Sequence, residues 1–171
     1  MQTSRSEVVM DVKIKAVQAV IPEDSNIIVG QSHFIKTVED LEEIIVSAVP
    51  GIQYGLAFNE ASGPCLVRTG GNEPSLVEAA KENALATKAG HTFYLLIKKA
   101  FPINILKQIQ ACGEVVNIYA ATANPLQIVL AESEQGNGIL GVIDGFAPKG
   151  VEGDADKKDR KDMLRLFGYK F

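Results

Sequence analysis

The feature that most constrains the fold is a strand-like segment that passes directly into an amphipathic helix between residues 26 and 48. Residues 26–29 are short and apolar, which is typical of a buried strand. In residues 38–48 the apolar side chains recur at helical spacing and the glutamates fall on the other face, which predicts a helix. Thr37 and Asp40 have the spacing of a capping box, so Thr37 is the expected N-cap residue. The pattern predicts a layered domain that packs helices on a sheet.

The rest of the chain continues this mixture of short strand-like and helix-like segments. Further strands are expected within residues 10–20, 52–57, 65–68, 92–97, 115–121, 126–131 and 139–143, and further helices at residues 74–89 and 102–112. The expected fold class is α/β or α+β: a single layered domain over residues 1–171, with a mixed β-sheet flanked by three to four helices. The densely charged residues 150–171 are expected to form a C-terminal helix and tail that docks through its last turns.

Composition excludes several classes of protein. The chain has 171 residues, which fits one domain, and a formal net charge of −4, which does not favour nucleic acid as a partner. No stretch approaches the roughly 20 apolar residues of a membrane span, and residues 1–7 lack the apolar core of a signal peptide. Cys65 and Cys112 form no CxxC pair, so no disulfide or zinc site is expected, and any other metal is left undecided. We therefore expect a cytoplasmic protein.

Residues 30–36 gather polar groups where the first strand gives way to the helix. They include Gly30, Gln31, Ser32, His33 and Lys36. A helix N-terminus offers free backbone N–H groups and the positive end of the helix dipole, so this loop is expected to bind an anion such as phosphate. The alternative is that Lys36 is an ordinary surface lysine.

Polar residues also follow other expected strands, and ligand sites of layered folds collect at such ends. The expected catalytic residues are Glu60, Asp144 and His33, and the expected ligand-binding residues are Gly30, Gln31, Ser32, Lys36, Ser62, His91, Thr122 and Asn124. Simpler explanations stay open: a turn-capping role for Asp144, a hydrogen-bonded structural histidine for His33 or His91, and an ordinary turn at Asn124.

Several catalytic motifs are missing from the chain. It has no GxxxxGK[ST] phosphate loop, no strand-coupled GxGxxG, no HExxH, no GxSxG and no protein-kinase signature. The lone GxG at residues 136–138 is interpreted as a hairpin turn. No motif alone identifies a reaction.

Longer segments of the chain resemble the archaeal and bacterial family of adenosine-specific kinases. The matching segments are residues 27–41, 58–63, 90–91, 102–104, 121–126, 139–145 and 164–170. The resemblance implies binding of adenosine and its nucleotides, ATP- and Mg²⁺-dependent phosphorylation of adenosine to AMP, and a homo-oligomer that is a trimer or a multiple of three. Asn59 stands where the family pattern has a cysteine, which argues against a cysteine-based mechanism.

Three functions are compatible with these residues. The first is an adenosine kinase that uses ATP and Mg²⁺, in which the protein mainly positions the reactants. The alternative is a non-catalytic adenine-nucleotide-binding protein, acting as a sensor or subunit. The third is a hydrolase or lyase acting on a nucleoside-like metabolite, with His33 and Glu60 as an acid–base pair.

Overall fold

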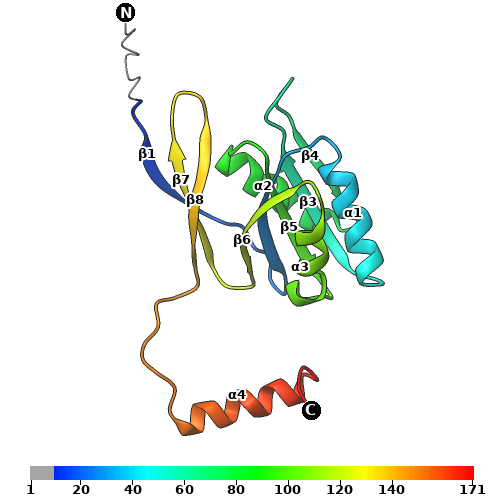
Figure 1. Ribbon diagram of the computed structural model, residues 1–171, viewed down its shortest axis with the longest axis vertical. Helices are drawn as coiled ribbons and strands as arrows, with labels where there is room; N and C mark the ends of the chain where they lie inside the picture. Colours follow the sequence, from blue (N-terminus) through cyan, green and yellow to red (C-terminus); the bar gives the residue numbers. More distant parts are fainter. Residues whose placement is uncertain (1–9) are drawn as a thin grey trace, which may run out of the picture.

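The structure is a computed structural model that describes residues 10–171, and these residues form eight strands and four helices (Figure 1). The strands are β1 (Lys13–Gln18), β2 (Asn26–Ser32), β3 (Gln53–Asn59), β4 (Val67–Gly71), β5 (Thr92–Lys98), β6 (Val115–Thr122), β7 (Leu126–Glu132) and β8 (Asn137–Asp144). The helices are α1 (Thr37–Ala48), α2 (Pro74–Thr87), α3 (Pro102–Ala111) and α4 (Asp154–Leu166).

The strands form two sheets, and every pair of neighbouring strands is antiparallel. The larger sheet has the order β4-β3-β5-β2-β6, and the smaller has the order β1-β7-β8. The class is therefore α+β, as expected, whereas the single mixed sheet of the sequence prediction is divided in two. Strand pairing depends on contacts between distant segments, so local periodicity could not reveal this division.

The larger sheet is buried on both faces because successive side chains of a strand point in opposite directions. Phe93, Leu95 and Ile97 of β5 face α1 and α3, while Tyr94 and Leu96 face the opposite side. On that opposite side α2 and the inner side chains of β7 complete a second core. Each fully buried aliphatic or Phe side chain contributes about 1.5–3 kcal/mol, so these two layers dominate the stability of the fold.

Helix α2 lies close to the sheet because β3 carries a glycine beneath it. A Cβ atom on Gly55 would lie 2.1 Å from the backbone carbon of Leu76. A larger residue would push α2 away from β3.

Two helix ends differ from the sequence prediction. Helix α1 begins at Thr37 itself, and its N-cap residue is Lys36, whose side chain makes no capping hydrogen bond. The Thr37 hydroxyl instead donates to the carbonyl of Phe34 and contacts Ser32 Oγ at 2.6 Å. Helix α2 ends at Thr87 rather than residue 89, because Lys88 adopts a left-handed conformation with φ of 49°. That conformation ends the helix two residues before Gly90.

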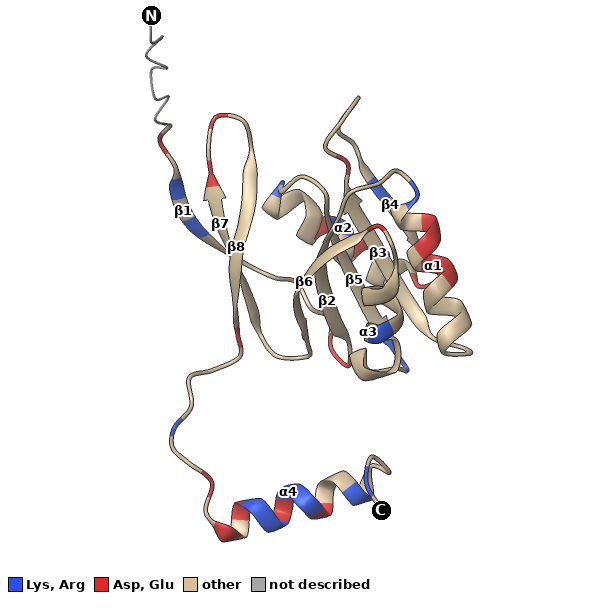
Figure 2. Cartoon of the chain, in the orientation of Figure 1, with Lys and Arg blue, Asp and Glu red and all other residues tan. Residues whose placement is uncertain are grey.

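The C-terminal segment leaves the body of the protein as an arm (Figure 1). Helix α4 has no buried residue, which differs from the expectation that it docks through its last turns. Its first two turns carry dense charges of both signs (Figure 2), whereas Leu166 and Phe167 near its end are mostly exposed apolar side chains. No helix among the described residues is both long enough and apolar enough to cross a membrane.

Candidate functional site

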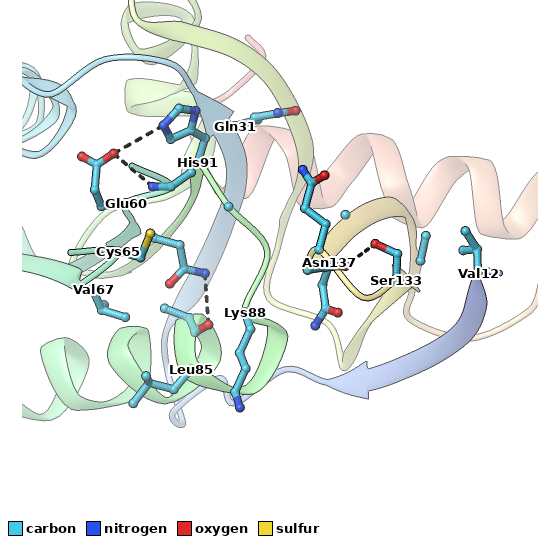
Figure 3. Close-up of a pocket in the computed structure, with 18 residues that line it drawn as sticks. Val12, Gln31, Glu60, Cys65, Val67, Leu85, Lys88, His91, Ser133 and Asn137 are labelled. Carbon is cyan, nitrogen blue, oxygen red and sulfur yellow. Dashed lines mark hydrogen bonds and ion pairs between the residues drawn. The ribbon is translucent and has the colours of Figure 1, made fainter. Parts of the chain in front are cut away.

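A cavity of about 830 Å³ lies where the ends of β3 and α2 meet the β7–β8 hairpin (Figure 3). Its volume falls within the range of roughly 300–1,000 Å³ that is typical of small-molecule pockets. The polar residues that line it are Gln31, Asn59, Glu60, Lys88, His91, Ser133, Gln135 and Asn137, and apolar contacts come from Val12, Val67 and Leu85. Amides, one carboxylate, one imidazole and one ammonium therefore converge on a partly apolar hollow.

Glu60 lies just after β3 and is held by a dense set of donors. Its Oε1 accepts hydrogen bonds from the Ser62 hydroxyl at 2.9 Å and from the backbone N–H groups of Ala61 and Ser62 at 3.0 and 3.2 Å. Its Oε2 pairs with Arg68 at 2.9 Å, and its side chain is only 7% exposed. Burial alone would raise the pKa of Glu60, but the donors from Ser62 and Ala61, together with Arg68, hold that pKa below its usual value. Glu60 is therefore a carboxylate at neutral pH and a weak base.

His91 stands beside this carboxylate. Its Nε2 lies 3.5 Å from Glu60 Oε1, and its ring stacks on Phe58 with centroids 5.9 Å apart and planes 10° apart. Two thirds of its side chain is covered, since 33% is exposed, and it points toward Glu60 (Figure 3). His91 adopts a left-handed backbone conformation with φ of 58°, which is uncommon for a residue with a side chain.

Residues from the β7–β8 hairpin close the other side of the cavity. Asn137 donates from Nδ2 to the Thr87 carbonyl and forms an isolated bridge with Ala89, which ties the smaller sheet to the end of α2. Lys88 follows that helix end and is the only ammonium or guanidinium group lining the cavity in the described part of the chain. Residues 136–138, interpreted above as a simple hairpin turn, therefore also line the site.

The first residues of the 30–36 loop use their backbone and side-chain polar groups within the protein. The backbone N–H of Ser32 donates to the His91 carbonyl at 2.8 Å, and that of His33 donates to the Glu114 carbonyl at 3.1 Å. The Ser32 hydroxyl is buried and bonded to the Glu114 carbonyl, and His33 Nε2 lies 3.3 Å from the Gly113 carbonyl. The amides of Ser32 and His33 are therefore not free to bind an anion, because β2 is an inner strand whose end is paired on both sides.

Packing explains why residue 30 is a glycine. A Cβ atom there would lie 2.3 Å from Cζ of Phe93, whose ring fills the space above the strand. Gln31, the next residue, does line the cavity, and its Oε1 accepts a hydrogen bond of 2.8 Å from the Tyr119 hydroxyl. With that oxygen held by Tyr119, the amide nitrogen of Gln31 is the group left to donate to a ligand.

Lys36 is neutralised by two carboxylates. Its Nζ lies 2.9 Å from Asp40 and 2.7 Å from Glu114, beside a separate hollow of about 680 Å³. Cys112 donates to Glu114 at 3.0 Å, and this bond together with Lys36 lowers the pKa of Glu114 to about 2. Ligand atoms of Asp40, Cys112 and Glu114 lie within 4.8 Å of one another, but the Lys36 ammonium already supplies a positive charge at this cluster. The expected free cation is therefore absent from this loop.

Asp144 belongs to a third cluster, away from the cavity. Its Oδ1 accepts from the Thr122 hydroxyl at 2.8 Å and from Asn124 Nδ2 at 3.1 Å, and Gly145 N donates to the Pro125 carbonyl. Asn137 and Asp144 occupy opposite ends of β8, and eight residues of a strand span about 24 Å. Glu60 and Asp144 therefore do not share the cavity, and the Thr122–Asn124–Asp144 cluster has the geometry of the turn-capping alternative.

Of the sequence-predicted residues, the structure brings Gln31, Glu60 and His91 together at the cavity, with Ser62 bonded to Glu60. It places Ser32, His33 and Lys36 at the α1 side, Gly30 under Phe93, and Thr122, Asn124 and Asp144 at the far end of β8. Asn59 was noted from the sequence only for its departure from the family pattern, and Lys88 and Asn137 were missed as lining residues. No local pattern marks them, because they come together through the contact between the two sheets.

The sequence model of a family described as adenosine specific kinase matches residues 17–170. No curated protein matches the chain. The crystal structure of the PH1918 protein from Pyrococcus horikoshii OT3 is similar to it, with 42% sequence identity, a TM-score of 0.90, and coverage of 94% of this chain and 99% of that chain.

Proposed function

Because the chain belongs to the adenosine-specific kinase family, we propose that the cavity beside Glu60 and His91 binds adenosine or AMP. The observation that carries this proposal is the convergence of the Gln31 amide, the Glu60 carboxylate and the His91 imidazole on one hollow. Amide donors recognise the ring nitrogens of a purine, and an ionised carboxylate accepts hydrogen bonds from ribose hydroxyls. Pockets of this kind combine apolar walls with a few polar groups that fix orientation.

Within this proposal each group has a separate task. The Gln31 amide nitrogen, with its oxygen held by Tyr119, donates to the base. Glu60 is kept ionised by its donors and accepts from a ribose hydroxyl, while His91 covers the ligand beside it. Lys88 attracts the phosphate of AMP from the rim of the cavity. Lys36, which is paired with Asp40 and Glu114, takes no part.

The activity proposed on the strength of the family is transfer of a phosphoryl group from ATP to adenosine. Mg²⁺ prefers oxygen ligands, and Glu60 is the only carboxylate lining the cavity in residues 10–171. Its Oε1 already accepts three hydrogen bonds and its Oε2 pairs with Arg68, so one lone pair of Oε2 is left. That single position can accept from a ribose hydroxyl, but it does not fit a Mg²⁺ ion held by the protein. The residues fit binding and orientation of the acceptor nucleoside.

A non-catalytic nucleotide-binding protein is the second candidate, and one observation favours it. The pKa of Glu60 lies below its usual value, so this carboxylate is a poor base for deprotonating a hydroxyl. The two candidates share the cavity and differ in turnover. Incubation with adenosine, ATP and Mg²⁺ forms AMP under the kinase proposal and forms none under the alternative.

Calorimetric titration tests the binding proposal. Adenosine should bind the protein, and Glu60→Gln should weaken that binding by about 10- to 100-fold, since a hydrogen bond to a charged group is worth roughly 1.5–3 kcal/mol. Asp144→Asn is the matched control, because it alters a carboxylate that lies outside the cavity. Equal losses in the two variants, or no binding of adenosine by the unaltered protein, would refute the assignment.

Self-association and a cytoplasmic location are proposed with this function. A homo-oligomer is supported by the arm, and the family resemblance suggests a trimer or a multiple of three. Isolated helices shorter than about 12–15 residues are marginal in water, yet among the described residues α4 has no buried side chain and is followed by exposed aromatic residues. A reducing compartment is supported by two free cysteines, of which Cys65 is exposed. Sedimentation equilibrium of the whole chain measures the assembly, and a monomer at all concentrations would contradict it.

A further inference from the structure

His91 is held in an uncommon conformation by bonds to both of its backbone groups. Its N–H donates to the Asn59 carbonyl at 2.7 Å, and its carbonyl accepts from the Ser32 N–H at 2.8 Å. The left-handed φ of 58° thus occurs at the residue whose ring lines the cavity. Strained backbone of this kind persists only where the surroundings impose it, and it clusters at functional sites.

Asn59 makes several of the contacts that hold His91 in this conformation. Asn59 ends β3 and is only 6% exposed. Its Nδ2 lies 3.0 Å from the carbonyl of Ala84 in α2, 3.0 Å from that of Ala89, and 3.3 Å from the Thr92 hydroxyl at the start of β5. One side chain therefore links the end of α2, the turn before His91 and the strand after it.

We propose that Asn59 is the positioning residue of this site: it clamps residues 89–92 and thereby aims the His91 imidazole at Glu60. The inference rests on the proposed adenosine-binding function and assigns to it a residue that touches the turn rather than the reacting groups. The carbonyl of Asn59 fixes the His91 nitrogen, and its amide fixes the carbonyl two residues earlier. Loss of the amide removes one donor from each of the Ala84 and Ala89 carbonyls, which keep the Lys88 N–H and the Thr92 hydroxyl as donors. It also removes the side-chain link between the end of β3 and the turn, so the turn is held less tightly.

A second buried asparagine provides a matched control. Asn83 is 2% exposed, and its side chain bonds the backbone N–H and carbonyl of Val20, each at 2.8 Å. It clamps the β1–β2 connection to α2 in the same chemical way, but it does not line the cavity. Asn59→Ala and Asn83→Ala therefore remove equivalent side chains, one bonded to the turn before His91 and one bonded to Val20.

The test measures His91 directly, with or without ligand. In isotope-labelled protein, Asn59→Ala should change the backbone shifts and the HN–Hα coupling of His91, whereas Asn83→Ala should leave them unchanged. Adenosine affinity should fall about tenfold in Asn59→Ala and stay within about twofold in Asn83→Ala, even where both variants lose similar thermal stability. Asn59→Ser keeps one donor and should restore part of both signals, which also provides a folded variant if the alanine substitution fails to fold.

The outcomes distinguish a failure of the proposed adenosine binding from a failure of the positioning role of Asn59. If the unaltered protein binds no adenosine, the proposed function fails, and the His91 spectra still decide the role of Asn59. If those spectra are the same in the unaltered protein and a folded Asn59 variant, Asn59 does not position His91. If Asn83→Ala shifts His91 equally, the effect is a general loss of stability, and the assignment is overturned.

Discussion

Substitution of Gly30 by alanine separates two explanations for this glycine. The added Cβ atom would lie 2.3 and 2.5 Å from ring carbons of Phe93 and 2.9 Å from the Asn117 carbonyl oxygen. Contacts under 3.0 Å force the ring or the strand to move, and overpacking of this kind costs about 1–3 kcal/mol. For a chain of this size 1 kcal/mol shifts the Tm by roughly 2–4 °C, so Gly30→Ala should lower the Tm by about 2–12 °C.

A second substitution shows whether the ring is the cause. Phe93→Leu removes the atoms that the new methyl would meet, so the loss in the double variant should be smaller than the sum of the two single losses. Residues in contact show coupling of about 0.5–3 kcal/mol in such cycles. Gly141→Ala in β8 is the control, because a Cβ there meets nothing within 4 Å. Denaturant unfolding monitored by circular dichroism measures all four variants.

The result that would refute this reasoning is a Gly30→Ala protein of unchanged stability. Additive losses from Gly30→Ala and Phe93→Leu would also show that the ring does not explain the glycine. Either result would favour the other explanation, in which Gly30 belongs to an anion-binding loop at residues 30–36.

Three further outcomes concern Glu114 and Lys36 beside the separate hollow and Lys88 at the cavity. Cys112 and Lys36 lower the pKa of Glu114 from 4.5 to about 2, so its contribution to stability is present above pH 4.5 and is lost as the pH falls toward 2. In urea unfolding across this window, the free energy of unfolding should therefore fall less steeply with pH for Glu114→Gln than for the unaltered protein. Lys88→Ala should weaken AMP binding more than adenosine binding, as measured by calorimetry. Lys36→Ala should leave both affinities unchanged, and a selective loss of AMP binding in this variant would place the phosphate at the α1 side instead.

The sequence was sufficient to predict most elements of the fold, since the buried strands and amphipathic helices leave clear periodicities. Residues 26–29, 92–97 and 126–131 were expected as strands and lie within β2, β5 and β7. The partition into two sheets was not predictable, because β1 pairs with β7, more than 100 residues away along the chain. Nothing local in either strand indicates its partner.

The candidate site was predictable only where a polar residue follows a strand and lies at the correct end of it. Glu60 met both conditions, whereas Asp144 ends a strand whose opposite end borders the cavity. Gly30 and Lys36 matched the chemistry of an anion site in type and spacing. The structure uses the same residues for packing under Phe93 and for ion pairs with Asp40 and Glu114. The residue types in a segment do not show which of their hydrogen-bond donors already have a partner in the fold.

The most direct test of the central claim is a crystal structure of the protein soaked with AMP. The account predicts ligand density in the cavity of about 830 Å³, with the ribose within hydrogen-bond distance of Glu60, the base beside Gln31, and the phosphate toward Lys88. Density for AMP at Lys36, or at the turn formed by Thr122, Asn124 and Asp144, would contradict it.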